Sequence, residues 1–188
     1  MSPLLPPLYA IVDVELCRVR GLDPLTVLAA FVAGGARFIQ LRDKSPSSGA
    51  RLALADAAVA LTRPAGARLV INDRADIARM CGADGVHVGQ DDLPVAAARR
   101  IVGAETLLGV STHDEAQLQA AMATDADYVA VGPIYGTATK SGSARIRRCS
   151  GMEVLIPSMT VISSVRRIRA MASCRSRPCT MILAIIES

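Results

Sequence analysis

Aromatic residues are scarce in this chain of 188 residues: only 3% are aromatic, and tryptophan is absent. Aliphatic side chains must therefore fill the core, because 51% of the residues are apolar. Val, Ile, Leu and Ala are typical of parallel strands that are buried on both faces. The length is sufficient for one domain with a substantial core.

Long hydrophobic runs and paired cysteines are also lacking. Met1–Pro7 has no basic start and contains three prolines, so no secretory signal is expected. The longest late apolar run, Met181–Ile186, is too short to span a bilayer, so no membrane partner is expected. The five cysteines lack zinc-finger and redox-motif spacing, which favours reduced thiols in a cytoplasmic protein.

Familiar catalytic motifs are absent as well. The chain has no HExxH or CxxC motif, no Walker phosphate loop and only two histidines. His87 lies in an apolar run, where we expect a hydrogen-bonded core histidine rather than a catalyst. His113 opens a helical stretch, where we expect exposure to solvent.

Positive charge is concentrated at one end of the chain. The formal net charge is +4, but residues 143–188 hold eight Arg and two Glu, which leaves a balance of −2 for residues 1–142. These arginines form no recognisable binding motif, and we expect no nucleic-acid partner. The change in composition divides the chain into one domain, 1–142, and an atypical Arg-, Ser- and Cys-rich segment, 143–188.

Short apolar runs alternate with Ala-rich helical stretches over most of the chain. This alternation predicts parallel strands joined by right-handed helical crossovers, in a barrel or in a doubly wound open sheet. The predicted strands are Leu8–Asp13, Arg37–Leu41, Leu69–Asn72, Gly85–Gly89, Leu107–Ser111 and Tyr128–Gly132. The predicted helices begin at Asp23-Pro24 and then cover Ser47–Leu61, Ala75–Cys81, Pro94–Val102 and Asp114–Ala123.

Polar residues gather where the predicted strands end. Polar groups at the carboxyl ends of successive parallel strands are how a (β/α)₈ barrel builds its active site. The clusters are Gln40–Lys44, Asn72–Arg74, Gly89–Asp92, Gly109–Thr112 and Gly132–Lys140.

Two of these clusters contain charged residues that suit a phosphorylated ligand. Arg42 and Lys44 can grip phosphate oxygens, or they can lie in a solvated loop with an ion pair to Asp43. Asp73 and Asp92 can hold Mg²⁺, which takes carboxylate oxygens, but each is also placed to cap the helix that follows it.

Hydroxyl groups in the later clusters suit a phosphate in the same way. Thr112 begins a capping-box sequence and is expected to start a helix, which leaves the Ser111 hydroxyl for a ligand. Thr137, Thr139 and Lys140 form either a phosphate cradle or a flexible surface turn.

In this order and spacing, the clusters resemble the thiamine-phosphate synthase family over residues 8–142. The resemblance is carried by Ile39–Lys44, Val70–Asp76, Gly82–Asp92 and Val129–Lys140. It implies a (β/α)₈ barrel that joins a pyrimidine diphosphate to a thiazole phosphate, releasing pyrophosphate, with Mg²⁺ as cofactor. The thiazole tautomerases share this barrel and remain an alternative, as does a non-catalytic remnant that binds only the pyrimidine diphosphate.

The resemblance also implies roles for individual residues. Asp73 and Asp92 would carry Mg²⁺, and Arg42, Lys44 and Lys140 would stabilise the leaving group. The expected substrate-binding set is Gln40, Leu41, Arg42, Asp43, Lys44, Asn72, Ser111, Thr137, Ala138, Thr139 and Lys140. Two small-molecule substrates are the expected partners.

The last segment lacks the strand ends that the family places after its sixth strand. Val154–Ile156, Thr160–Ile162 and Met181–Ile186 have strand-like composition, but no glycine-rich strand end accompanies them. We therefore expect an incomplete barrel of six recognisable strands. Its open sheet edges would favour a homo-oligomer, and the abrupt change in composition suggests a change of reading frame.

Overall fold

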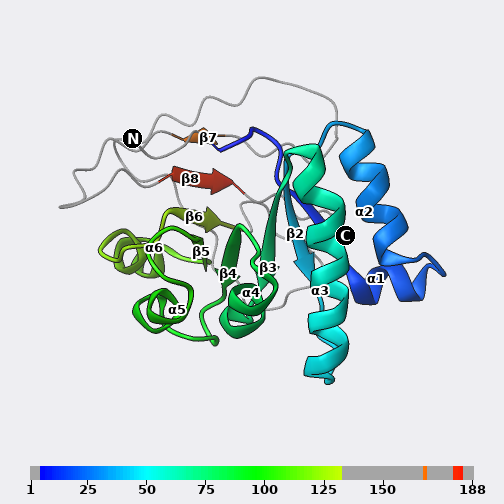
Figure 1. Cartoon of the computed structure of the whole chain (residues 1–188). Coiled ribbons are helices and arrows are strands. Elements are labelled where there is room, and N and C mark those ends of the chain that lie inside the picture. Colours follow the sequence, from blue (N-terminus) through cyan, green and yellow to red (C-terminus); the bar gives the residue numbers. More distant parts are fainter. Residues whose placement is uncertain (1–4, 133–166, 169–179, 184–188) are drawn as a thin grey trace.

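In the computed structural model of the chain, the described residues are 5–132, 167–168 and 180–183. They form a curled sheet with helices on its outer side (Figure 1). The strand order is β1-β2-β3-β4-β5-β6-β8-β7, so the first six strands lie beside one another in chain order. The strands are β1 (Ala10–Asp13), β2 (Phe38–Arg42), β3 (Arg68–Asn72), β4 (Gly85–Val88), β5 (Leu107–Thr112), β6 (Tyr128–Val131), β7 (Arg167–Ile168) and β8 (Thr180–Leu183).

Local sequence explains where several helices begin. The Asp23 side chain accepts the Thr26 N–H, and Pro24 supplies the first helical residue of α2. Ser47 caps α3 in the same way by accepting the Ala50 N–H. The helices are α1 (Val14–Val19), α2 (Pro24–Ala33), α3 (Ser48–Thr62), α4 (Ala75–Cys81), α5 (Val95–Val102) and α6 (Glu115–Met122), with a 3₁₀ turn, η1, at Arg63–Ala65.

The curled sheet separates two hydrophobic clusters. The larger one lies between the strands and the helices and includes Ile39, Ile71 and Val129. The smaller one lines the inner face with Leu5, Tyr9, Phe38, Val70 and Tyr128. Because side chains alternate along each strand, the residues between the outward-facing ones point into the barrel.

The expected incomplete (β/α)₈ barrel is confirmed. All six predicted strands form, and β1 to β6 pair in parallel. β8 (Thr180–Leu183) overlaps the strand-like run Met181–Ile186 at residues 181–183 and pairs in parallel with β6. The neighbouring β7 runs antiparallel to β8 and so departs from barrel topology.

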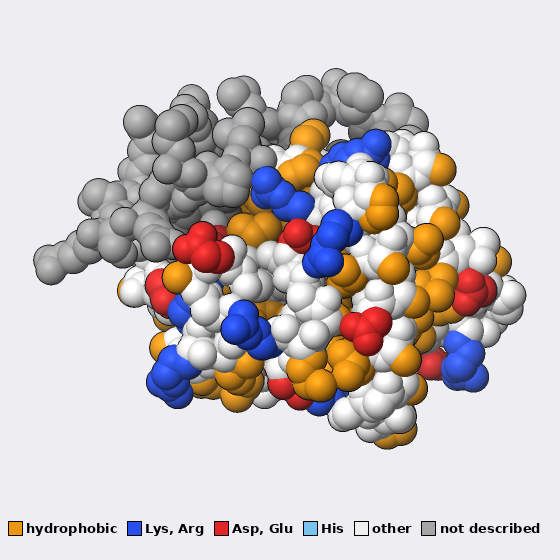
Figure 2. All heavy atoms as spheres, in the orientation of Figure 1, with side chains coloured by type: hydrophobic (Ala, Val, Ile, Leu, Met, Phe, Trp, Pro, Cys, Tyr) orange, Lys and Arg blue, Asp and Glu red, His pale blue; other side chains and the backbone are white. Residues whose placement is uncertain are grey.

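Some of the predictions from the sequence concern residues that lie outside the described ones. They include the boundary at residue 142 and the strand-like runs Val154–Ile156 and Thr160–Ile162. Among the helices that are described, none is both long enough and apolar enough to cross a membrane. Figure 2 shows acidic and basic side chains interspersed over the described part of the face that carries α3 to α5, without a single basic patch.

Candidate functional site

Charged side chains meet where β1, β2 and β3 end. The Arg42 guanidinium, at the end of β2, is hydrogen-bonded to the Asp13 carboxylate at the end of β1. Lys44, just beyond β2, lies 3.2 Å from an Asp73 oxygen, measured from its Nζ. The ion pairs therefore join different strand ends, and the alternative of a local pair with Asp43 is wrong for both cations.

Asp73 and Asp92 lie together, and neither caps a helix. The N-cap of α4 is Arg74 and that of α5 is Pro94, and neither cap position makes a side-chain hydrogen bond, so the capping alternative is wrong. Asp92 Oδ2 instead accepts the Gly89 N–H at 2.7 Å. Burial, followed by the hydrogen bond and charge of Asp92, raises the pKa of the Asp73 carboxyl, while Lys44 acts in the opposite direction.

Asp73 also has a backbone conformation that is unfavourable for a residue with a side chain. Its φ is 64°, in the left-handed region, which costs about 1–2 kcal/mol. Its N–H donates to the His87 carbonyl oxygen at 2.7 Å, which ties this turn to β4. Strain retained next to a second carboxylate is typical of a functional position.

A chain of hydrogen bonds crosses the inside of the barrel beneath these charges. Gln40 Nε2 donates to Tyr9 Oη at 2.9 Å, and Tyr9 Oη lies 2.9 Å from Tyr128 Oη. His87 Nδ1 lies 3.1 Å from Tyr128 Oη, and His87 Nε2 lies 2.8 Å from Ser111 Oγ. The expectation of a hydrogen-bonded core histidine is therefore confirmed for His87.

Burial determines the protonation states along this chain. It lowers the pKa of His87 to about 4, so the imidazole is neutral near pH 7, although the Asp92 charge acts in the opposite direction. It raises the pKa values of Tyr9 and Tyr128 above their ordinary value, so both phenols keep their protons. Each group in the chain can therefore serve as a neutral hydrogen-bond donor or acceptor.

Asn72 faces the inside of the barrel with a free donor. The residue is 8% exposed, and among the described residues its Nδ2 has no hydrogen-bond partner. A buried amide without a partner is costly unless a ligand or water satisfies it. Asn72 is thus the neutral side chain best prepared to receive a ligand.

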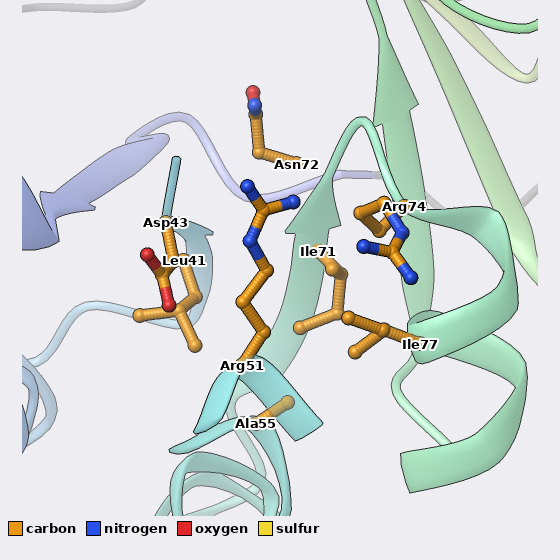
Figure 3. A pocket seen from close by; sticks show the side chains of 8 residues that line it. All are labelled: Leu41, Asp43, Arg51, Ala55, Ile71, Asn72, Arg74 and Ile77. Atoms are coloured by element: carbon orange, nitrogen blue, oxygen red, sulfur yellow. The ribbon is translucent and has the colours of Figure 1, made fainter. Parts of the chain in front are cut away.

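Leu41 and Asp43 alternate with Gln40 and Arg42, and they lie on the other side of β2. Leu41 is buried in the outer core, and Asp43 Oδ1 accepts the Ser45 N–H at 2.8 Å. Both line a recess of about 10 Å³, enough for about one water molecule. Figure 3 shows Arg51 rising from α3 into this recess, between Asp43 and Arg74. A ligand in the barrel mouth would meet the backbone of Leu41 and Asp43 rather than their side chains.

The expectation that Thr112 starts a helix at the end of β5 is wrong. Thr112 remains part of the strand, where its hydroxyl donates to the Ala130 carbonyl, and Asp114 caps α6 instead by accepting the Gln117 N–H. Strand pairing with β6 continues through Thr112, which moves the helix start two residues along. His113 is half-buried, with its Nδ1 2.6 Å from the Gly132 carbonyl oxygen.

Three residues of this arrangement were not identified from the sequence. The sequence pattern marks Asp13 only as a strand end, and Tyr9 and Tyr128 as strand residues without a role. The chain has only three tyrosines, and two of them meet inside the barrel. Because aromatic residues are so scarce, the presence of Tyr9 and Tyr128 in two predicted strands is the sequence signal that could have identified them. The expected site residues Thr137, Ala138, Thr139 and Lys140 lie outside the described residues.

The strand order and the polar strand ends define a βα-barrel protein with a mixed carboxylate and basic site at the carboxyl ends of its strands. The family model of thiamine monophosphate synthase matches residues 8–165. The match extends past residue 142, where the resemblance carried by the motifs ends. The chain belongs to the thiamine monophosphate synthase family.

Individual relatives agree with the family match. A thiamine-phosphate synthase of Solidesulfovibrio magneticus is 45% identical over 147 residues, 78% of this chain and 69% of the relative. One from a Roseiflexus species is 46% identical over 132 residues, covering 70% and 55%. The solved thiamine phosphate pyrophosphorylase of Pyrococcus furiosus is 28% identical, with a TM-score of 0.63 and coverage of 69% and 61%. The chain thus spans only 55% to 69% of the length of these proteins.

Proposed function

We propose that this chain catalyses thiamine phosphate formation from a pyrimidine diphosphate and a thiazole phosphate, with release of pyrophosphate. The observation that carries the proposal is the meeting of Asp73, Asp92 and Lys44 at one barrel mouth, directly above a buried layer of neutral donors. Carboxylates for a metal ion beside cations for a diphosphate are what this substrate requires. A thiazole tautomerase would need no such pair of opposite charges.

The diphosphate would be held by residues from three strand ends, those of β2, β3 and β5. Arg42 and Lys44 supply charge, and Gln40, Asn72 and Ser111 supply neutral donors from the inner layer. Asn72 is the clearest candidate because its buried Nδ2 has no partner among the described residues. In this proposal Lys140 also contacts the diphosphate, and Thr137, Ala138 and Thr139 contact the thiazole phosphate.

Asp73 and Asp92 have the chemistry to hold Mg²⁺. Both offer hard carboxylate oxygens. Burial raises the pKa of the Asp73 carboxyl and the neighbouring Asp92 raises it further, and a divalent cation would relieve the repulsion between the two. The described residues contain no cluster of three or more potential ligands, so water and substrate phosphate would complete the coordination. When bound, Mg²⁺ would neutralise negative charge on the departing pyrophosphate.

The chain's own residues would act mainly by positioning and by charge. The bond between the pyrimidine methylene carbon and the diphosphate oxygen breaks, and the thiazole nitrogen then forms a new bond to that carbon. Arg42, Lys44 and Lys140 would stabilise the leaving pyrophosphate. No proton transfer is required in these steps, which agrees with a buried neutral His87.

We also propose a cytoplasmic location and self-association through the open sheet. Cys17 and Cys81 are free thiols, as is usual in reducing compartments. Within the described residues, β1 pairs on one side only, with β2, and an unpaired edge favours association.

The test is thiamine phosphate formation by the purified chain with both substrates and Mg²⁺. We expect product, its loss with EDTA, and a decrease of about 10²-fold or more for Asp73→Asn. Asp91→Asn, which changes an exposed neighbouring carboxylate, is the matched control and should keep its activity. A folded chain that binds neither Mg²⁺ nor the pyrimidine diphosphate would contradict the proposal, and one that binds the diphosphate without turnover would be the non-catalytic remnant.

A further inference from the structure

We propose that Tyr128 and His87 are positioning residues that make the Ser111 hydroxyl a hydrogen-bond donor to an anionic substrate oxygen at the barrel mouth. The inference deepens the proposed function and rests on it for the identity of the ligand. The hydrogen-bond chain Gln40–Tyr9–Tyr128–His87–Ser111 carries it.

The direction of the hydrogen-bond chain, that is, which group donates to which, follows from counting protons. The Gln40 amide donates to Tyr9 Oη, so the single Tyr9 proton is available for Tyr128 Oη. The Tyr128 proton then goes to His87 Nδ1, its other partner. A neutral imidazole has one N–H. With Nδ1 accepting, the proton is on Nε2, which donates to Ser111 Oγ.

This direction determines what Ser111 offers a ligand. The hydroxyl has one proton, and once its oxygen accepts from His87 that proton is free to point elsewhere. Ser111 is half-buried near the end of β5, so its hydroxyl lies at the boundary between the inner layer and the mouth. Phosphate oxygens at neutral pH act mainly as acceptors. The opposite direction would use the Ser111 proton on His87 and leave only oxygen lone pairs for the anion.

Packing inside the barrel holds the hydrogen-bond chain in place. The Tyr9 ring stacks on Phe38 with centroids 4.3 Å apart, and it meets Tyr128 edge-on at 5.9 Å. Tyr9, His87 and Tyr128 are each at most 8% exposed, so water has little access to compete for their hydrogen bonds. The proposed function assigns no direct ligand contact to Tyr9, His87 or Tyr128.

The first experiment measures the tautomer of His87 by ¹⁵N NMR on the ¹⁵N-histidine-labelled full chain near pH 7. We expect the proton on Nε2, with Nδ1 unprotonated. A proton on Nδ1 would mean that the chain runs the other way and would overturn the proposal. This measurement needs no substrate and is independent of activity.

The second experiment asks whether Tyr128 acts through Ser111. The dissociation constant of the pyrimidine diphosphate with Mg²⁺ is measured by calorimetry for the parent, Tyr128→Phe, Ser111→Ala and the double variant. We expect each single change to weaken binding about 3- to 10-fold, and the double variant to be no weaker than Ser111→Ala within about 2-fold. Asp56→Ala, at an exposed position of α3 outside the barrel interior, is the control and should leave the affinity within about 2-fold.

The outcomes separate the two proposals. Multiplicative losses in the double variant, or full affinity in Tyr128→Phe, would show that Tyr128 does not act through Ser111 and would overturn the inference. A folded parent that binds no diphosphate would contradict the proposed function, and the tautomer would still establish the direction of the chain on its own.

Discussion

Gly109 in β5 shows how a missing side chain shapes this site. A Cβ there would lie 2.0 Å from Cζ and 2.4 Å from Oη of Tyr128. The Tyr128 ring therefore crosses β5 over the bare backbone of Gly109 to reach Tyr9 and His87. The hydrogen-bond chain that reaches Ser111 depends on this close approach.

We predict that Gly109→Ala displaces the Tyr128 ring and lowers the free energy of unfolding by about 1–3 kcal/mol. The measurement is urea denaturation followed by circular dichroism. Gly49→Ala in α3 is the control, since a Cβ there meets nothing within 4 Å and helix propensity favours alanine. Equal stability of the two variants would show that the barrel interior accommodates the methyl group without strain.

Burial of His87 predicts a pH dependence of stability. Its pKa is lowered from 6.5 to about 4 in the folded state, so as the pH falls through this range only the unfolded chain takes up the proton. The folded state then loses up to about 3 kcal/mol of stability between pH 6.5 and pH 4. Denaturation curves of the parent and His87→Gln at pH 7 and pH 5 test this, because the effect of Asp73 is common to both chains. We expect a flatter profile for the variant, and parallel profiles would contradict the prediction.

At the scale of the elements, an Ala-Asp pair precedes two of the strands and makes the same kind of hydrogen bond in both places. Gly82-Ala83-Asp84 leads into β4 and Asp125-Ala126-Asp127 leads into β6. The Asp84 side chain accepts the Leu69 N–H of β3, and the Asp127 side chain accepts the Leu108 N–H of β5, each at a distance of 2.8 Å. The aspartate before one strand thus holds the start of the preceding strand, at the end of the barrel opposite the site.

We predict that Asp84→Ala lowers the free energy of unfolding by about 1–3 kcal/mol, because the Leu69 N–H loses its acceptor. Affinity for the pyrimidine diphosphate should not change, because Asp84 lies at the far end of the strands. Urea denaturation and calorimetric titration measure the two quantities. Asp56→Ala, at an exposed position of α3, is the control and should be nearly neutral. A loss of ligand affinity equal to that of a mouth variant would contradict this separation.

At the scale of the whole molecule, the late strand β8 covers the edge of β6. Four register pairs join them, from Tyr128 with Thr180 to Val131 with Leu183. The strand runs parallel to β6, as a seventh barrel strand would, while β7 beyond it is antiparallel. The barrel thus gains a seventh position among its described strands, but these strands do not close into a ring.

We predict that a chain ending at residue 179, which lacks β8, is less stable than the full chain and associates at lower concentration. Without β8, the backbone N–H and C=O groups along that edge of β6 have no partners. Gel filtration over a concentration series and thermal unfolding measure both effects. A chain ending at residue 183 keeps β8 and is the control. Identical behaviour of the two truncated chains would show that the β6–β8 pairing contributes little to stability.

The sequence predicted the local elements well because they depend on near neighbours. Apolar runs bounded by Gly and Asp located all six barrel strands, and the Asp23-Pro24 pair located the start of α2. Capping was predicted less well at Asp73, Asp92 and Thr112. At these strand ends, partners from other strands compete with the local helix start, and a local pattern contains no information about them.

The alternation of strands and helices and the polar clusters at the strand ends follow from the sequence alone, because hydrophobic periodicity and turn chemistry are local. Which polar groups meet depends on the folded arrangement of the strands. Lys44 pairs with Asp73 rather than Asp43, and Tyr9 reaches Tyr128, 119 residues away, because the sheet curls. Curling brings strand ends into one mouth and rings into one interior, and those distances are properties of the folded chain alone.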